Sequence, residues 1–166
     1  MTLRERFTDE IKTAMKAGNK PRVSTIRMIQ AALKDKDIEA RGGGKGPIPD
    51  DEILALLQKM LKQRGESITI YEQNARPELA AGEREEQGII SEFLPQPLGE
   101  AETAAAIEAA VASTGAASVK DMGKVIALLR AEHAGRMDFG KVSGLVKARL
   151  GGRLIAFTSR RAGRPG

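Results

Sequence analysis

Apolar residues recur along the first half of the chain at the spacing of amphipathic helices. A first stripe is formed by Leu3, Phe7, Ile11, Ala14 and Met15, which fall on one helical face. The stripe follows Thr2 and Glu5, the two positions of a capping box, in which each side chain satisfies a free backbone amide of the first turn. The pattern therefore predicts a first helix that ends near Gly18.

Three further helices are predicted before residue 95. The second begins at Asn19–Pro21, the third follows Asp50 and Asp51, and the fourth starts at Arg76–Pro77. Between the second and third, residues 42–49 hold four glycines and two prolines, which predicts a flexible loop. The expected inward-facing residues are Val23, Ile26, Ile29, Leu33, Ile38, Ile53, Leu56, Leu57, Met60, Leu61, Ile68, Tyr71, Leu79, Ile89, Ile90 and Phe93. We therefore expect an N-terminal helical domain of about four helices, residues 1–94.

A second, smaller domain is predicted beyond Pro95 and Pro97, which enforce an extended connection. Its three helices are expected from Glu100 to about Thr114, after Ser118–Asp121, and from Asp138 to Leu150, with Ile107, Val111, Met122, Val125, Ile126, Leu129, Val142, Leu145, Val146 and Leu150 inward. The fold class is thus all-α, with a three-helix domain at residues 98–150. Residues 151–166 start with two glycines and carry four arginines without helical period, so we expect a disordered basic tail there.

The amino-acid composition favours helices and also bears on the compartment in which the protein is expected. Aromatic residues make up only 3% of the chain, which disfavours a β-sheet core. There is no apolar run of 18 residues, and charges at Arg4 and Glu5 stand where a signal peptide needs apolar residues. The chain has no cysteine, which suits a reducing compartment. These features predict a cytoplasmic protein that is not embedded in a membrane.

Few residues are suited to catalysis or metal binding. The only histidine is His133, and spacing alone pairs it with neither a nucleophile nor an orienting acid. The acidic runs Asp50–Glu52 and Glu83–Glu86 are explained by a helix start and a solvated helix face. The glycine-rich loop lacks the spacing and the Lys-Ser/Thr ending of a phosphate-binding P-loop. We therefore predict no catalytic residue, no metal site and no cofactor.

Charge is distributed unevenly along the chain. Residues 1–48 hold 11 basic and 6 acidic residues, whereas residues 49–97 hold 5 and 10. Basic residues also follow both of the last two predicted helices: Lys120, Lys124, Arg130, Arg136, Lys141, Lys147 and Arg149. Such side chains bind phosphates without reading sequence, but an ordinary soluble surface with intermixed acids is the favoured explanation from the residues alone.

Several separated motifs give the chain a specific resemblance. They are Ile26–Asp35 (IRMIQAALKD), Lys59–Arg64 (KMLKQR) with Ser67-Ile68, Glu92–Leu98 (EFLPQPL), Lys120–Val125 (KDMGKV), Gly135–Asp138 (GRMD) and Val146–Leu150 (VKARL). In this order they resemble the YqeY family, also called GatB/YqeY-domain proteins, over most of residues 3–150. The resemblance implies two helical domains, the second similar to the tail of the B subunit of tRNA-dependent amidotransferases, which helps to hold tRNA. The catalytic cradle of that subunit has no match here.

The resemblance implies a tRNA-associated binding module that is not catalytic alone. On this basis the candidate nucleic-acid contacts are Lys124, Arg136, Lys141 and Lys147, which belong to or adjoin the tail-like motifs. Two alternatives remain open. One is an accessory component of a carbon–nitrogen ligase that uses glutamine as amide donor, with amidotransferase or other translation-related partners. The other is a protein-interaction adaptor that uses exposed helical grooves.

Overall fold

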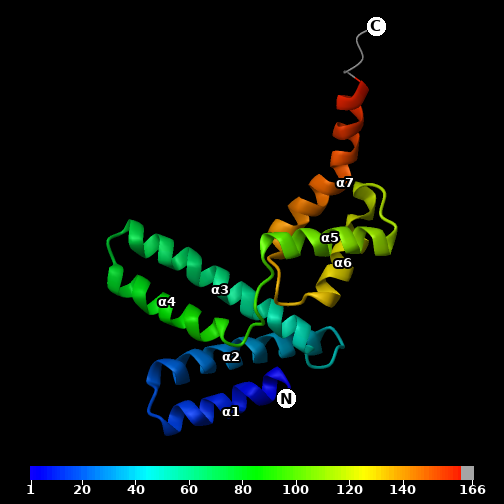
Figure 1. Ribbon diagram of the computed structural model, residues 1–166. Helices are drawn as coiled ribbons and strands as arrows, with labels where there is room; N and C mark the ends of the chain where they lie inside the picture. The colour runs from blue at the N-terminus through cyan, green and yellow to red at the C-terminus, as the bar shows by residue number, and fades with distance from the viewer. Residues whose placement is uncertain (162–166) are drawn as a thin grey trace. The chain divides into compact units, whose positions relative to one another are not determined.

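The chain is helical throughout the part that its computed structural model describes, which is the backbone of residues 1–161 and the side chains of residues 1–151. The helices are α1 (Leu3–Lys16), α2 (Lys20–Gly42), α3 (Asp50–Gln73), α4 (Pro77–Ser91), α5 (Glu100–Thr114), α6 (Met122–Glu132) and α7 (Phe139–Arg161), with a short 3-10 turn, η1 (Val119–Asp121), before α6 (Figure 1). Residues 1–161 contain no strand, so the all-α prediction is confirmed. Two compact units are distinguished, Met1–Pro95 and a second that begins at Gln96.

The predicted capping box at Thr2 and Glu5 is present, and Ser118 with Asp121, where the sequence predicted a helix start, forms a second one. The Thr2 hydroxyl accepts a hydrogen bond from the Glu5 amide at 3.2 Å, and the Glu5 carboxylate accepts one from the Thr2 amide at 2.8 Å, which lowers the pKa of Glu5. In the second unit, the Asp121 carboxylate accepts from the amides of Ala117 at 3.0 Å and Ser118 at 3.3 Å, which lowers the pKa of Asp121. These bonds fix where α1 and η1 begin, and α6 follows η1 directly.

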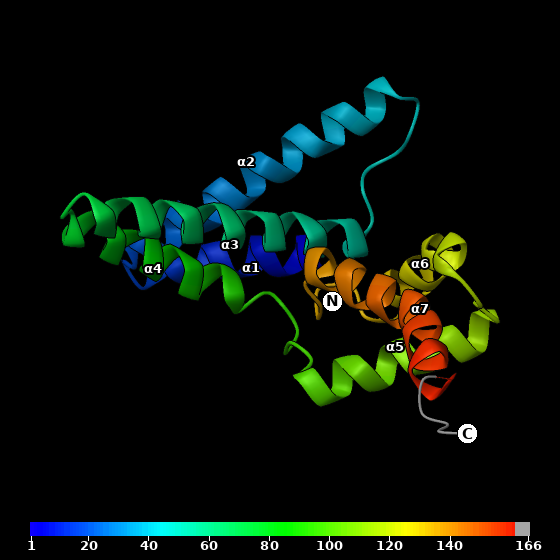
Figure 2. The ribbon, with the colours of Figure 1, turned by 90° about the horizontal axis from the view of Figure 1, so that it is seen from above.

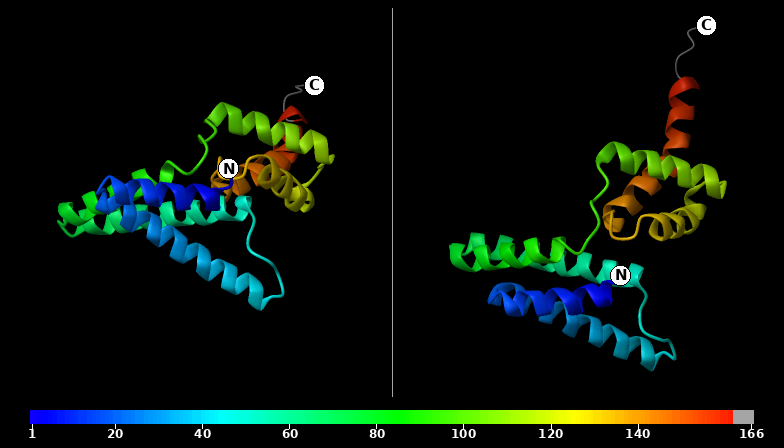
Figure 3. Two further views of the ribbon diagram at one scale, coloured as in Figure 1. Left: turned by 90° about the horizontal axis from the view of Figure 1, so that it is seen from below. Right: turned by 60° about the horizontal axis from the view of Figure 1, so that its bottom comes forward.

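The first unit is a four-helix assembly around an aliphatic core with two phenylalanines. α3 packs along α4, α2 packs on both, and α1 packs on α2. Figures 2 and 3 show α2 and α3 spreading apart toward the loop that joins them. Its buried residues are Phe7, Ile26, Ile29, Leu33, Ile48, Ile53, Leu56, Leu57, Met60, Ile90 and Phe93. The core thus uses one face of each of the four helices.

The second unit is smaller, and its described core contains no buried aromatic ring. α6 packs against both α5 and α7. The buried residues are Ile107, Ala110, Val111, Ala116, Val125, Leu129, Met137, Val142, Val146 and Leu150. Gly115 ends α5 in the left-handed conformation, with φ of 67°, which glycine adopts without a steric cost.

Four expectations about individual apolar residues are wrong. The stripes were expected to include Met15, Ile38, Leu79 and Leu145, yet Met15 and Ile38 are each 55% exposed, Leu79 is 44% exposed and Leu145 is 51% exposed. Core positions of these helices are taken by neighbours: Phe7 and Ala14 on α1, Ile29 and Leu33 on α2, Ile90 on α4, and Val142 and Val146 on α7. Asp50 and Asp51 also differ slightly from expectation, because they lie inside the first turn of α3 and Pro49 takes the cap position.

The last helix is longer than the sequence pattern suggests. α7 continues through Gly151 and Gly152 to Arg161, where we expected a disordered tail from residue 151. Two helical glycines cost about 1 kcal/mol each, but extending an existing helix is easier than starting one. The remaining residues of that expected tail, 162–166, lie outside the described part of the chain.

Candidate nucleic-acid interface

The four predicted contact residues all belong to the second unit, on elements that pack together. Lys124 lies in the first turn of α6, Arg136 in the connection to α7, and Lys141 and Lys147 on α7. The three lysines are exposed, whereas Arg136 is half-buried. Lys124, Lys141 and Lys147 make no ion pair with any residue whose side chain the structure describes, so their charges are available to a ligand.

The two lysines of α7 flank its exposed face. The buried side of the helix carries Val142 and Val146. Lys141 precedes this stripe and Lys147 follows it, and six residues along a helix leave them about 120° apart. Gly144 and Ala148 are exposed between them on the helix surface, so only small residues separate the two charges. A broad ligand such as a nucleic-acid backbone can approach it without meeting a bulky side chain.

Arg136 has a different role from the lysines. Its Nε donates a hydrogen bond to the Gln96 carbonyl at 3.0 Å, and its own carbonyl accepts one from the Leu98 amide at 2.9 Å. The residue therefore fastens the proline-containing segment at the start of the second unit to the turn before α7. This positioning role was missed, because the partners lie 40 residues apart in the sequence.

Two further cations of the second unit are engaged internally. Arg149 pairs with Glu108 of α5, which raises the pKa of Arg149. The guanidinium of Arg130 lies 5.4 Å from the ring centre of Phe139, within the range of a cation–π interaction. Neither was among our candidate contacts, and the structure gives both a packing role.

Residues considered for catalysis show no assembled reaction centre in the described part of the chain. His133 is half-buried; its Nδ1 has no hydrogen-bond partner among the described atoms, and its Nε2 lies 3.9 Å from Glu132. No group of three His, Asp or Glu side chains within the described residues is arranged to hold a metal ion. The absence of a catalytic or metal site stays a prediction.

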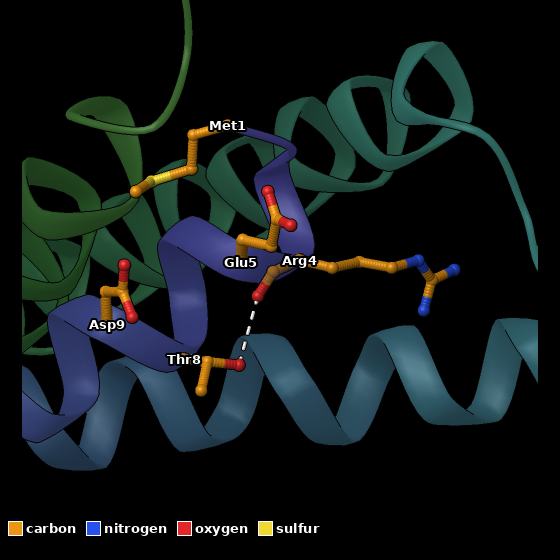
Figure 4. A pocket seen from close by; sticks show the side chains of 5 residues that line it. All are labelled: Met1, Arg4, Glu5, Thr8 and Asp9. Carbon is orange, nitrogen blue, oxygen red and sulfur yellow. Dashed lines mark hydrogen bonds between the residues drawn. The ribbon is translucent and has the colours of Figure 1, made fainter.

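The hollow at the start of α1 also uses residues that already have partners. It is lined by Met1, Arg4, Glu5, Thr8 and Asp9, and the Thr8 hydroxyl donates to the Arg4 carbonyl at 3.1 Å (Figure 4). The Arg4 guanidinium binds Asp37, and the Glu5 carboxylate belongs to the capping box. The polar side chains of Arg4, Glu5 and Thr8 are therefore already engaged within the protein, so this hollow has few groups left to bind a ligand.

Arg4 and Asp37 anchor the end of the glycine-rich loop. Both Arg4 terminal nitrogens donate to the Asp37 carboxylate at 2.8 Å, and one also reaches the Ile48 carbonyl at 3.0 Å. The Ile48 amide donates to Asp37 at 3.0 Å. The Arg4 hydrogen bonds and then the Ile48 amide lower the pKa of Asp37 to about 2. The loop that we expected to be flexible is thus held at its last turn.

Two of the sequence motifs in the first unit, Lys59–Arg64 and the start of Glu92–Leu98, likewise join helices. Arg64 of α3 donates to Glu86 of α4 at 3.0 Å and to the Met60 carbonyl at 3.2 Å. Glu92 and Phe93, just beyond α4, are held by arginines: Arg22 pairs with Glu92, and Arg6 donates to the Glu92 carbonyl at 2.7 Å. The residues of these two motifs therefore have structural roles in joining helices, and no catalytic role is needed to account for them.

Comparison with known proteins places these features in a family. The family model described as "Yqey-like protein" matches residues 4–150. Similar curated proteins include "Altered inheritance of mitochondria protein 41, mitochondrial" from Clavispora lusitaniae, 34% identical over 85 residues, and from Eremothecium gossypii, 31% identical over 98 residues. These alignments cover 51% and 58% of this chain and 47% and 52% of the relatives. The chain therefore spans about half the length of the curated relatives it matches.

The names of these relatives overturn one expectation. We expected a cytoplasmic protein from the composition and the first residues, whereas the relatives from Clavispora lusitaniae, Pyrenophora tritici-repentis and Saccharomyces cerevisiae are named as mitochondrial. The cytoplasmic prediction is wrong, because composition and the lack of cysteine do not separate one reducing compartment from another. Among the described residues, no helix is both long enough and apolar enough to cross a membrane.

Proposed function

Since the chain belongs to the YqeY-like family, whose model matches residues 4–150, we propose that it is a non-catalytic module that binds an RNA backbone, that of tRNA, through its second unit. The choice of tRNA comes from the resemblance of residues 98–150 to the tail of the amidotransferase B subunit. The proposal includes a relation to glutamine-dependent tRNA amidotransferases, in which this chain supplies binding and a partner supplies the reaction.

The exposed, unpaired lysines Lys124, Lys141 and Lys147 carry the proposal. They stand on α6 and α7, which pack against one another, so the spacing of the charges is fixed by a folded core. An ammonium group binds a phosphate by charge and needs no particular base beside it. The second unit has no exposed tryptophan or tyrosine among its residues, so binding by base stacking is not part of the proposal.

Arg136 is assigned a supporting role in this proposal. Its Nε already donates to the Gln96 carbonyl, so only its terminal nitrogens remain to bind a phosphate. We therefore expect its substitution to act on the conformation of the Gln96–Leu98 segment more than on RNA affinity.

The test compares two triple variants of the full chain for tRNA affinity across a range of salt concentrations. In Lys124→Gln/Lys141→Gln/Lys147→Gln, three phosphate contacts are lost, so affinity falls and the salt slope decreases by about three units. The matched control is Lys45→Gln/Lys59→Gln/Lys62→Gln, which removes the same charge from exposed positions of the first unit.

The arginines after Leu150 need a separate control, because they attract any polyanion. Since α7 continues to Arg161, the four arginines are replaced by glutamine rather than removed by truncation: Arg153, Arg160, Arg161 and Arg164. If the first triple variant binds tRNA as tightly as its matched control in this background, the proposed surface is not the RNA site.

A further inference from the structure

We propose that the groove between the end of α1 and the first half of α2 docks an amphipathic helix of a partner protein, apolar on one face and acidic along its flanks. This goes beyond the RNA-binding proposal, because it concerns the other unit and a different class of partner. The groove is lined by Ala14, Met15 and Gly18 from α1 and the turn after it, and by Lys20, Val23, Ser24, Arg27, Met28 and Ala31 from α2.

The α2 residues of this groove form one continuous helical face. Their spacing alternates between three and one, which places them in a row along about three turns. Lys20, Ser24, Arg27 and Ala31 are exposed, so no described element covers this row. A face of this length matches the i, i+3, i+4, i+7 anchors by which a partner helix lies in a groove.

The floor of the groove is apolar and adaptable. Met15 is 55% exposed although it lies beside Ala14, which is buried in the structure. Val23, Met28 and Ala31 continue the apolar surface along α2. Methionine adjusts its shape to different partners because its side chain is unbranched and flexible. This floor would gain from burying apolar side chains, which a nucleic-acid backbone does not supply.

The groove continues toward α3 through Met28. A second hollow is lined by Met28 and Ala32 from α2 and by Leu56 and Met60 from α3, among others. Because Met28 lines both hollows, the two meet at this side chain. The IRMIQAALKD and KMLKQR motifs contribute residues to this second hollow, whose lining carries both acids and cations, so the proposed docking site is the hollow between α1 and α2.

The charges around the groove indicate the sign of the partner. No acidic residue lines the hollow between α1 and α2. Five cations lie in it or within one helical turn of it and form no ion pair among the described residues: Lys12, Lys16, Lys20, Arg27 and Lys34. Two acids of α1 and α2 lie within the same range, Glu10, which pairs with Arg22, and Asp35, so the balance is positive. By contrast, Arg22 of the same helix is neutralised by Glu10 and Glu92. Carboxylates on the flanks of a docked helix would complete the pairing of the five cations.

The experiment measures the binding of a fluorescein-labelled synthetic peptide to the full chain by fluorescence anisotropy. The peptide has 18 residues, with leucine at i, i+3, i+4 and i+7 and glutamate and alanine elsewhere; a second peptide carries lysine in place of every glutamate. We expect the acidic peptide to bind at least tenfold more tightly than the lysine peptide, with an affinity that falls as salt is added.

Three variants locate the site. Lys20→Glu/Arg27→Glu is expected to weaken the acidic peptide at least tenfold and to bind the lysine peptide better than the wild type does. Met15→Gln tests the floor and is expected to weaken binding about threefold to tenfold, because the polar amide must be buried. Lys45→Glu/Lys62→Glu, with the same charge change at exposed sites elsewhere in the unit, should leave the affinity within twofold.

Other occupants give different results. If the lysine peptide binds as tightly as the acidic one, or if Lys20→Glu/Arg27→Glu leaves the acidic peptide unaffected, the proposal is overturned. A single-stranded RNA that displaces the peptide and is equally sensitive to Lys20→Glu/Arg27→Glu, but not to Met15→Gln, would assign the groove to nucleic acid instead. Self-association that is abolished by Lys20→Glu/Arg27→Glu would assign it to a second copy of this chain. Circular dichroism confirms that each variant keeps its helices.

Discussion

The two units bind their helices together in different ways. In the first unit, arginines bridge separate helices through carboxylates and ring faces, as Arg22 does between Glu10, Glu92 and the ring of Phe93. In the second, helices meet mainly through apolar side chains without aromatic rings, with Arg149–Glu108 as the interhelical ion pair among its described residues. The first unit thus uses several of its arginines to join its own helices, whereas most of its unpaired cations lie on α1 and α2; the second unit leaves Lys124, Lys141 and Lys147 unpaired on α6 and α7.

The difference suggests which part of each surface is available for binding. Where a cation is held by two acids, its loss mainly affects folding. Where a cation is exposed and unpaired, its loss mainly affects a ligand, because a surface charge contributes little to stability. Substitutions that separate stability from binding therefore test the comparison.

The largest effect is expected for Phe93→Ala. Phe93 is 1% exposed, and its ring meets that of Phe7 edge-on at 5.0 Å with the Arg6 guanidinium 4.8 Å from its centre. Removing it leaves a cavity and removes the ring contacts with Phe7 and Arg6, so we expect a loss of about 3–5 kcal/mol in the unfolding free energy of the first unit. Urea unfolding measures this loss, and Leu79→Ala, at an exposed position, should stay within about 0.5 kcal/mol.

A matched substitution in the second unit is Leu129→Ala, at a side chain with no exposed surface. It is expected to cost about 2–5 kcal/mol and to accelerate amide hydrogen exchange in α5–α7 but not in α1–α4. The reverse pattern is expected for Phe93→Ala. If each variant accelerates exchange equally in all seven helices, the units unfold as one and the predicted domain boundary is wrong.

A smaller effect is expected for Asp37→Asn. Arg4 and the Ile48 amide lower the pKa of Asp37 from 3.8 to about 2, so the ionised form stabilises the native state above about pH 4. This contribution is lost as the pH falls from about 4 to 2. We expect the variant to lose about 1–2 kcal/mol at pH 7 and to approach the wild type near pH 2. A pH series of urea midpoints checks this; a difference that stays constant with pH would exclude the mechanism.

A modest effect is expected for Arg136→Ala. The Nε bond to the Gln96 carbonyl is exposed, so its loss should cost about 0.5–1 kcal/mol. Faster proteolysis near Gln96 would report the released segment, while tRNA affinity should change by less than for the substitution of Lys124. A loss of affinity equal to that of Lys124→Ala, with unchanged proteolysis, would make Arg136 a direct contact.

No effect is expected in a test for catalysis. Protein free of other subunits should not convert Glu-tRNA with ATP and glutamine, because the sequence has no match to the catalytic cradle of the B subunit. Measurable turnover would contradict this prediction. A rate increase on adding the chain to a reconstituted amidotransferase would favour the accessory-component alternative.

Local signals in the sequence predicted the helices well. Thr2 with Glu5 and Ser118 with Asp121 are three residues apart, so their capping bonds depend only on the immediate chain. Periodicity also found the buried faces of most helices. It failed at Leu145. This residue adjoins Val142 and Val146 in a broad apolar stripe, and spacing alone does not reveal which of these side chains the neighbouring helix covers.

Contacts between distant residues could not be predicted in this way. Glu86 was interpreted as part of a solvated acidic face, yet it binds Arg64, 22 residues earlier. Arg22 is one of the 11 basic residues counted in residues 1–48, yet it is paired with Glu92, 70 residues away. The sequence displays the charges but not the packing that brings them together. The same limit applies to the candidate site, where Arg136 and the three lysines look alike in sequence and differ in the fold.

The most direct test of the division between the units is a titration of the isotopically labelled full chain with tRNA, followed by amide NMR at two salt concentrations. We predict that chemical shifts change in α6 and α7 around Lys124, Lys141 and Lys147, that the changes diminish at higher salt, and that the groove residues Met15 to Ala31 are unaffected. Changes that concentrate in α1 and α2 and leave α6 and α7 unperturbed would contradict the assignment of RNA binding to the second unit.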